Sequence, residues 1–162
     1  TSTHLAAEMF KQAAGIYVTH IPYRGSSPAV ADVIAGQLPL LVDSVASSTA
    51  QVRAGKLKAL ATTSPRRLAV LPDLPTVAES GYPGFESTAW VGLLAPAGTP
   101  KAIIEQLNAQ VLKVMALPET RERMAGFGAE ITTSTPERFA AHIRSEIDKL
   151  GKVIRDARIK VD

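Results

Sequence analysis

A short polar segment near residue 25 carries side chains that can bind a small anion. Residues 23–27 read Tyr-Arg-Gly-Ser-Ser, follow a strand-like run and lead directly into a helical pattern. Arg24 supplies a cation, Gly25 lets the backbone approach a ligand closely, and the hydroxyls of Ser26 and Ser27 can donate hydrogen bonds. A helix N-terminus adds free backbone N–H groups and the positive end of a dipole. The segment therefore predicts a binding site for a carboxylate or a similar small anion.

Other polar side chains follow neighbouring strand-like runs. Asp43 and Ser44 come after the second run, and residues 62–64, Thr-Thr-Ser, come after the third. Ser2 and Thr3 stand at the start of the first helical pattern. In an open parallel sheet, ligands bind beyond the carboxyl ends of the strands, so we expect these groups to share one crevice. Asp43 would present the opposite charge there, suited to an ammonium, a hydroxyl or a bound water.

Each of these residues also has a purely structural interpretation. Ser27 precedes Pro28, a pairing typical of a helix cap followed by the first helical residue. Asp43 and Ser44 form a similar cap pair for the next helix, and Arg24 in an exposed turn can simply be solvated. The sequence favours a binding role because the polar ends converge on one edge of the predicted sheet.

The sequence contains no pattern for catalysis, metal binding or a cofactor. It has no cysteine, which excludes disulfides, thiolate chemistry and cysteine-based zinc sites. The histidines, His4, His20 and His142, are scattered and do not indicate a metal centre. No nucleophile elbow, phosphate-binding loop or dinucleotide fingerprint occurs. We therefore expect a protein that is not an enzyme, with no catalytic residues, no metal and no cofactor.

Charge and hydropathy narrow the class of partner. The net charge is +3, but the basic residues are dispersed and no aromatic side chains interleave with them. Nucleic acid is therefore not an expected partner. No uninterrupted apolar run approaches the roughly 18 residues of a membrane span. With 46% hydrophobic residues, the chain can still build a core for one domain or two small ones.

The first part of the chain alternates between strand and helix patterns. A helix is expected from the first residues, capped by Ser2 or Thr3 and ended by Gly15. The patterns that follow predict strand 16–21, helix 27–36, strand 38–42, helix 44–55 and strand 56–62. This alternation predicts an α/β fold with a parallel sheet.

The second part follows a connection rich in proline and glycine. It predicts a strand at 87–98, helices at 100–116 and 118–125, a strand at 129–133 and a long helix from Pro136. Thr99 and Thr135 are expected to cap the first and last of these helices. A hinge near 62–65 would divide the chain into units 1–64 and 65–162. The second unit has too few strands for its amphipathic helices, so we expect it to be incomplete.

Seven motifs in order then resemble one family. They are STHLAAEMF, THIPYRGSSPAVADVIAGQ, LVDS, GKLKALATTSPRR, LPDLPTVAESGYPGFE, WVGLLAPAGTP and HIRSEIDKLGKVIRDARIK. Together they resemble the extracytoplasmic solute receptors of the tripartite tricarboxylate transporter system, the Bug family. The resemblance covers essentially the whole chain.

This resemblance implies a three-layer αβα lobe of the type II periplasmic-binding-protein class that binds a small carboxylate. It implies a periplasmic receptor that delivers its ligand to the membrane permease subunits of the transporter. Ser2 and Thr3 match the helix start that contacts ligand in the family. Gly25, Ser26 and Ser27 match the carboxylate seat of its second lobe, and Asp43 matches the aspartate at the next strand end.

The chain departs from the family in length, because family members are about twice as long. The resemblance implies that 1–64 is the complete second lobe and that 65–162 is the returning part of an incomplete first lobe. We expect any signal for export to be encoded upstream of the residues given. Helices built to cover a missing sheet would expose apolar stripes, so we expect a homodimer formed through them. The alternative is a truncated interaction or structural module whose ligand site is vestigial.

Overall fold

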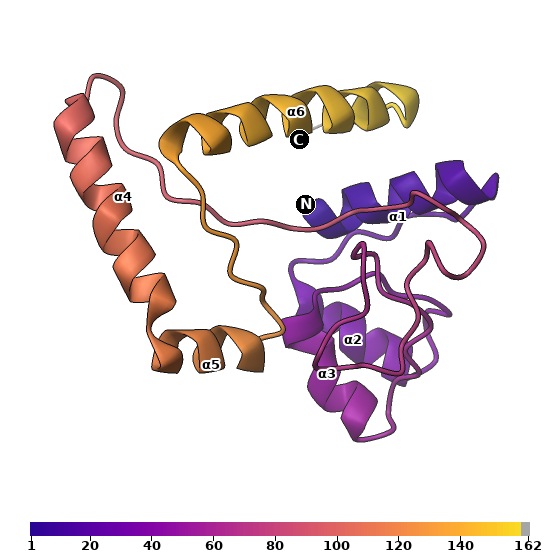
Figure 1. Cartoon of the computed structure of the whole chain (residues 1–162). Helices are drawn as coiled ribbons and strands as arrows, with labels where there is room; N and C mark the ends of the chain where they lie inside the picture. The colour runs from indigo at the N-terminus through magenta and orange to yellow at the C-terminus, as the bar shows by residue number, and fades with distance from the viewer. Residues whose placement is uncertain (160–162) are drawn as a thin grey trace. The chain divides into compact units, whose positions relative to one another are not determined.

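The computed structural model describes residues 1–159 of the 162-residue chain. Contacts divide the chain into two compact units, Thr1–Ala89 and a second that begins at Trp90 (Figure 1). This division differs from the predicted boundary between residues 64 and 65. That boundary was meant to separate the two lobes of a receptor, not two groups of residues in contact. That lobe assignment stays a prediction.

Helices form most of the regular structure of both units (Figure 1). They are α1 (Ser2–Ala14), α2 (Ser26–Ile34), α3 (Val45–Arg53), α4 (Lys101–Ala116), α5 (Pro118–Gly126) and α6 (Pro136–Asp156). All six coincide with helices predicted from the sequence. Apolar periodicity was the signal for α1, α4 and α6, whereas α2 was predicted from its serine and proline at the helix start.

The predicted N-caps of α1, α2 and α4 are wrong by one residue or more. Thr1, not Ser2 or Thr3, caps α1 by accepting a hydrogen bond from the backbone N–H of His4 at 3.4 Å. Ser27 lies inside α2, because the helix already begins at Ser26 with Gly25 as its N-cap.

The predicted cap of α4 is also replaced. The hydroxyl of Thr99 donates to the carbonyl of Pro96 at 2.8 Å, and Pro100 is the N-cap. Thr135 does cap α6, as predicted, because its side chain accepts from the backbone N–H of Arg138 at 3.3 Å. Thr99 therefore closes its own turn instead of the helix that follows.

The predicted strands do not pair into ladders within residues 1–159. The only bridges described there join Thr62 with Thr76 and Leu68 with Leu71. Strand structure needs a neighbouring backbone at hydrogen-bonding distance. The N–H of Ser87 donates to the carbonyl of Thr63 at 2.9 Å, but among the described residues the segments at 17–21 and 88–95 have no such partner. Their apolar side chains are correspondingly exposed, with Tyr17 at 86% and Val91 at 99%.

The connection after the third predicted strand is ordered by an unpredicted pairing. The backbone N–H of Thr62 donates to the carbonyl of Pro75, and that of Val77 donates to the carbonyl of Thr62, both at 2.9 Å. Thr76 between them is only 2% exposed. Glu79 accepts from the Thr76 N–H at 2.7 Å, while the Thr76 hydroxyl accepts from the Glu79 N–H at 3.0 Å. These two reciprocal hydrogen bonds have the pattern of a capping box and hold the segment against residue 62.

Aromatic side chains link α1 to the end of that connection. The ring of Phe10 packs edge-on against Tyr82, with centroids 5.5 Å apart, and against Phe85 at 6.3 Å. Phe85 is buried. Edge-to-face pairs of this kind stabilise by about 0.5–1.5 kcal/mol beyond the area that they bury.

In the second unit, α6 packs against the segment that begins at Trp90. The ring of Phe139 lies edge-on to Trp90 at 5.6 Å between centroids, and His142 lies 5.1 Å from the same indole. Phe139 also covers Gly92 so closely that an added Cβ would stand 2.1 Å from its Cζ. The absence of a side chain at Gly92 is therefore what admits the ring.

Replacing Gly92 by alanine should displace the Phe139 ring and destabilise the second unit. Overpacking of this kind costs on the order of 1 kcal/mol or more. Gly151→Ala in α6 is the matched control: its added Cβ would meet only the tip of Arg155 at 3.4 Å, and alanine favours a helix. Urea unfolding should show a loss for Gly92→Ala and a neutral or stabilising effect for Gly151→Ala. Equal stability of the two variants would contradict the close contact.

Candidate ligand-binding site

Asp43 is the centre of a hydroxyl cluster that joins two helix starts. Its Oδ1 accepts from the Ser26 hydroxyl at 2.5 Å, and its Oδ2 accepts from those of Ser47 at 2.6 Å and Ser48 at 2.5 Å. Ser26 is the first residue of α2, whereas Ser47 and Ser48 lie in the first turn of α3. The predicted proximity of residues 26 and 43 is therefore confirmed.

Ser47 and Ser48 are members of this cluster that the sequence interpretation missed. Ser47 follows Asp43 by four residues, so helical spacing would have placed it beside the carboxylate, whereas Ser48, five residues on, carried no such signal. Ser44, a predicted site residue, is the N-cap of α3 but makes no side-chain cap bond. Its hydroxyl lies 2.6 Å from that of Ser47 instead.

The cluster keeps Asp43 ionised. Partial burial acts to raise the pKa of Asp43, but hydrogen bonds from Ser26, Ser47, Ser48 and the Ser44 backbone outweigh it, and the net pKa is lowered. Hydrogen bonds to the charged form favour it over the neutral acid. Asp43 is therefore a carboxylate at neutral pH, and the three hydroxyls donate hydrogen bonds to it.

The direction of these hydrogen bonds changes the role predicted for Ser26. Because its hydroxyl donates to Asp43, the same proton cannot be donated to a ligand carboxylate. The remaining donors at this position are the backbone N–H groups of the first turn of α2. No side chain caps them, and a helix has no internal partners for its first N–H groups. Ser27 is an exposed residue of the same turn, and no hydrogen bond of its hydroxyl is described within residues 1–159, so it can donate to a ligand.

Gly25 sets the direction from which the chain enters α2. Its backbone has φ 115° and ψ 174°, a region that is essentially restricted to glycine. Nothing lies within 4 Å of an added Cβ, so conformation and not space requires the glycine here. Gly25 therefore fixes the orientation of the α2 start toward Asp43.

The residues on either side of this turn have different environments. The Tyr23 hydroxyl donates to Asp32 of α2 at 2.5 Å. This hydrogen bond raises the pKa of Tyr23 and anchors the turn to the helix that it precedes. Arg24 is exposed, and within the described residues it forms no ion pair. A solvated cation at the rim of the α2 start is suited to attracting an anion.

Ser2 and Thr3 lie at the start of α1 and make no described contact with the Asp43 cluster. The Thr3 hydroxyl lies 3.1 Å from that of Thr1, and Ser2 is exposed. α1 is tied to the chain just before the turn, because the ring of His4 stacks on that of His20 at 3.8 Å. The structure thus joins residues 26 and 43 directly, while the predicted role of Ser2 and Thr3 stays a prediction.

His4 also makes a contact with Glu8 that the sequence interpretation overlooked. His4 and Glu8 have i, i+4 spacing, and the His4 Nε2 lies 3.5 Å from the Glu8 carboxylate. Glu8 is buried and also pairs with Lys11 at 2.8 Å. Burial and the neighbouring His4 lower the pKa of His20. Among residues 1–159, no group of histidines and carboxylates has the arrangement of a metal site.

The lowered pKa of Asp43 predicts acid sensitivity of the cluster. A folded pKa below the ordinary 3.8 means that the carboxylate stabilises the native state above that pH. This contribution is lost as the pH falls through the lowered folded pKa. The difference in unfolding free energy between the wild type and Asp43→Asn should therefore be constant from about pH 7 to about pH 5 and shrink below about pH 4. A difference that grows on acidification would contradict this.

Comparison with known proteins identifies the family. A family model described as the tripartite tricarboxylate transporter family receptor matches residues 1–159. A protein of Pseudomonas sp. strain P51, the UPF0065 protein in the tcbD-tcbE intergenic region, is 39% identical over the whole chain. The chain covers 48% of that relative, so it spans about half of its length.

Two solved structures share the fold. "R. palustris Rpa4515 with adipate" has a TM-score of 0.86 and 34% identity, and the alignment covers 98% of this chain and 53% of that one. Periplasmic binding protein BugD has a TM-score of 0.82 and 38% identity over 98% of this chain and 54% of its own. These matches confirm the predicted α/β class, which the unpaired extended segments alone did not reveal. The chain belongs to the TctC, or Bug, family of tripartite tricarboxylate transporter receptors.

Proposed function

We propose that the chain supplies a carboxylate-binding lobe of a periplasmic solute receptor, without enzymatic activity. The observation that carries this proposal is the start of α2, where Asp43 holds Ser26 and the N-cap Gly25 has no side chain to cap the first N–H groups. These N–H groups and the dipole of α2 favour a carboxylate. Arg24 at the preceding turn adds positive charge.

The family supports the choice of ligand class and of transport partner. One relative of the same fold is described with adipate, and the family is that of transporter receptors. We propose that this chain binds a small carboxylate and serves the membrane permease subunits of a tripartite tricarboxylate transporter. No helix within residues 1–159 has the length and hydropathy needed to cross a membrane.

Isothermal titration of the full chain with adipate tests the ligand class. Hexanediol is the matched control, because it has the same carbon chain without charge. We expect saturable binding of adipate and none of hexanediol. Equal binding of both compounds, or no binding of either, would overturn the proposal.

A second candidate function, assembly through an apolar surface, is favoured by exposure in the second unit. Val91 is 99% exposed, Leu94 is 81% exposed and Leu93 is 74% exposed. Contiguous exposed apolar residues mark interaction surfaces in soluble proteins. We propose that two copies of the chain associate here, whether or not the ligand site is functional.

Light scattering tests this association. The wild type should have twice the mass of the 17.1 kDa chain, and Leu94→Glu should be monomeric. Ala97→Glu, an exposed residue outside the apolar run, is the matched control and should remain dimeric. A monomeric wild type would refute the dimer.

A further inference from the structure

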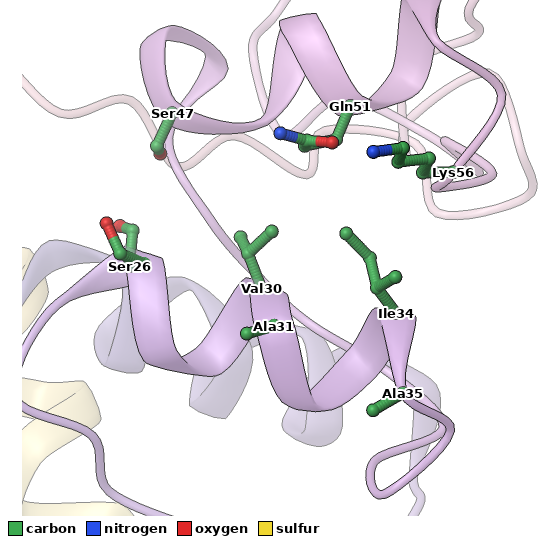
Figure 2. Close-up of a pocket in the computed structure, with 9 residues that line it drawn as sticks. Ser26, Val30, Ala31, Ile34, Ala35, Ser47, Gln51 and Lys56 are labelled. Atoms are coloured by element: carbon green, nitrogen blue, oxygen red, sulfur yellow. The ribbon is translucent and has the colours of Figure 1, made fainter.

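A pocket between α2 and α3 has two chemically different walls. It has a volume of about 460 Å³, within the range of small-molecule sites. Val30 and Ile34 project into it from α2, while Gln51 and Lys56 stand on the opposite side (Figure 2). One wall is therefore apolar, and the other carries an amide and a cation.

The position of Lys56 is set by the turn that ends α3. Gly55 adopts φ 69°, and the backbone N–H of Lys56 then donates to the carbonyl of Gln51 at 2.9 Å. This left-handed turn returns residue 56 beside the last turn of the helix, as C-terminal glycine motifs do. No carboxylate of the described residues pairs with Lys56, so its charge is available to a ligand.

The opposite end of the pocket has a different electrostatic character. Ser26 and Ser47 line that end (Figure 2), and both donate their hydroxyl protons to the ionised Asp43. Inside the pocket, a ligand carboxylate would find no free proton on these two hydroxyls; the small carboxylate of the proposed function uses the backbone N–H groups at the start of α2 instead. At the Lys56 end, a ligand carboxylate would meet an ammonium, with the amide of Gln51 beside it. An anionic group is therefore best placed beside Lys56.

We propose that this pocket is a second ligand site that takes an amphipathic monocarboxylate, such as a medium-chain fatty acid. Its carboxylate pairs with Lys56 and Gln51, and its hydrocarbon lies on Val30 and Ile34. A sugar would leave the apolar wall without a partner, and a cation would be repelled by Lys56. A pure hydrocarbon would remove Lys56 and Gln51 from water without replacing their hydrogen bonds.

This site goes beyond the proposed function, because the small carboxylate of that function binds at the start of α2. The pocket runs along the sides of α2 and α3 and reaches the start of α2 at its Ser26, Ser27 and Ser47 end, whereas Lys56 stands at the other end. Competition between the two ligands therefore separates the two sites on the same chain. Failure of adipate binding would not remove the signal for a fatty acid.

Calorimetric titration of the full chain with butanoate, hexanoate and octanoate tests the apolar wall. Burial of each added methylene should raise the affinity by up to about fourfold. Ile34→Ser should flatten this dependence on chain length. Equal affinity for the three acids in the wild type would overturn the proposal.

Lys56→Gln tests the cationic end, with Lys58→Gln as the matched control. Lys58 is also exposed but does not line the pocket. We expect octanoate affinity to fall about five- to tenfold in Lys56→Gln, as for loss of a partly exposed charged hydrogen bond, and to be unchanged in Lys58→Gln. Equal losses in both variants would indicate non-specific charge attraction and overturn the site. Competitive displacement of octanoate by adipate would also overturn it, because the two acids would then share one site.

Discussion

Replacing Asp43 by alanine should weaken adipate binding about five- to tenfold and destabilise the fold by about 1–2 kcal/mol. The stability loss follows because Ser26 and Ser48, which are half-buried, would lose their shared acceptor. Since both are partly open to water, the cost stays below that of a fully buried unpaired hydroxyl. Urea unfolding and calorimetric titration of the same preparation measure the two effects.

The sign of the binding effect is a balance of two terms. Removing Asp43 also removes a negative charge near the ligand carboxylate, which by itself would tighten binding. That repulsion is weakened by the hydroxyl and backbone donors that already satisfy Asp43 and by its contact with water. The ordering of the α2 start should therefore dominate, and the net effect should be a loss of affinity.

Two further variants separate these terms. Asp73→Ala is the matched control, because Asp73 is an exposed carboxylate for which no partner is described; its loss should change neither property. Asp43→Asn keeps the size of the side chain and removes its charge. Tighter adipate binding by Asp43→Asn than by the wild type would show that repulsion dominates, and the positioning role of Asp43 would be wrong.

Helix positions could be predicted from the sequence because the signals are local: an apolar period in α1, α4 and α6, and a cap or glycine at the ends of others. Phe139, Ile143 and Ile147 recur at helical spacing, and a long helix is observed there as α6. Helix starts were less predictable, because a hydroxyl near the start can either cap the helix or form a hydrogen bond with a residue elsewhere in the chain. Ser26 meets Asp43, seventeen residues later in the chain, and no local pattern records that contact.

Strand pairing could not be predicted from the same signals. The run around Val91 and Leu94 has the apolar composition of a buried strand, yet both side chains are mostly exposed. Composition indicates that a segment suits a sheet but not which backbone will pair with it. The pairing of residue 62 with 75–77 shows the converse, because a proline-rich segment supplied the partner.

The candidate site was predictable in part, through the rule that strand ends converge. That reasoning placed Gly25, Ser26 and Asp43 together, and the hydroxyl cluster confirms that Ser26 and Asp43 meet. It assigned the Ser26 proton to the ligand, whereas the structure gives that proton to Asp43. The direction of a hydrogen bond depends on the ionisation of its acceptor, which sequence alone did not reveal.

Gly25→Ala should destabilise the chain by about 1–3 kcal/mol and reduce adipate affinity together with stability. At φ 115° and ψ 174° an alanine is strained, although the space for its Cβ is free. The chain would relieve the strain by rotating the α2 start away from Asp43. Ser26 and the first N–H groups of α2 would then lose their orientation.

Gly126→Ala provides a control of the same chemistry with the opposite sign. Gly126 is the last residue of α5, has no left-handed backbone and has open space around an added Cβ. Alanine there should be neutral or stabilising by up to about 1 kcal/mol, because it favours the helix and restricts the unfolded chain. If both variants were equally stable, the α2 start would tolerate a relaxed backbone. The orientation of Ser26 would then depend on the Asp43 cluster alone and not on the conformation of Gly25.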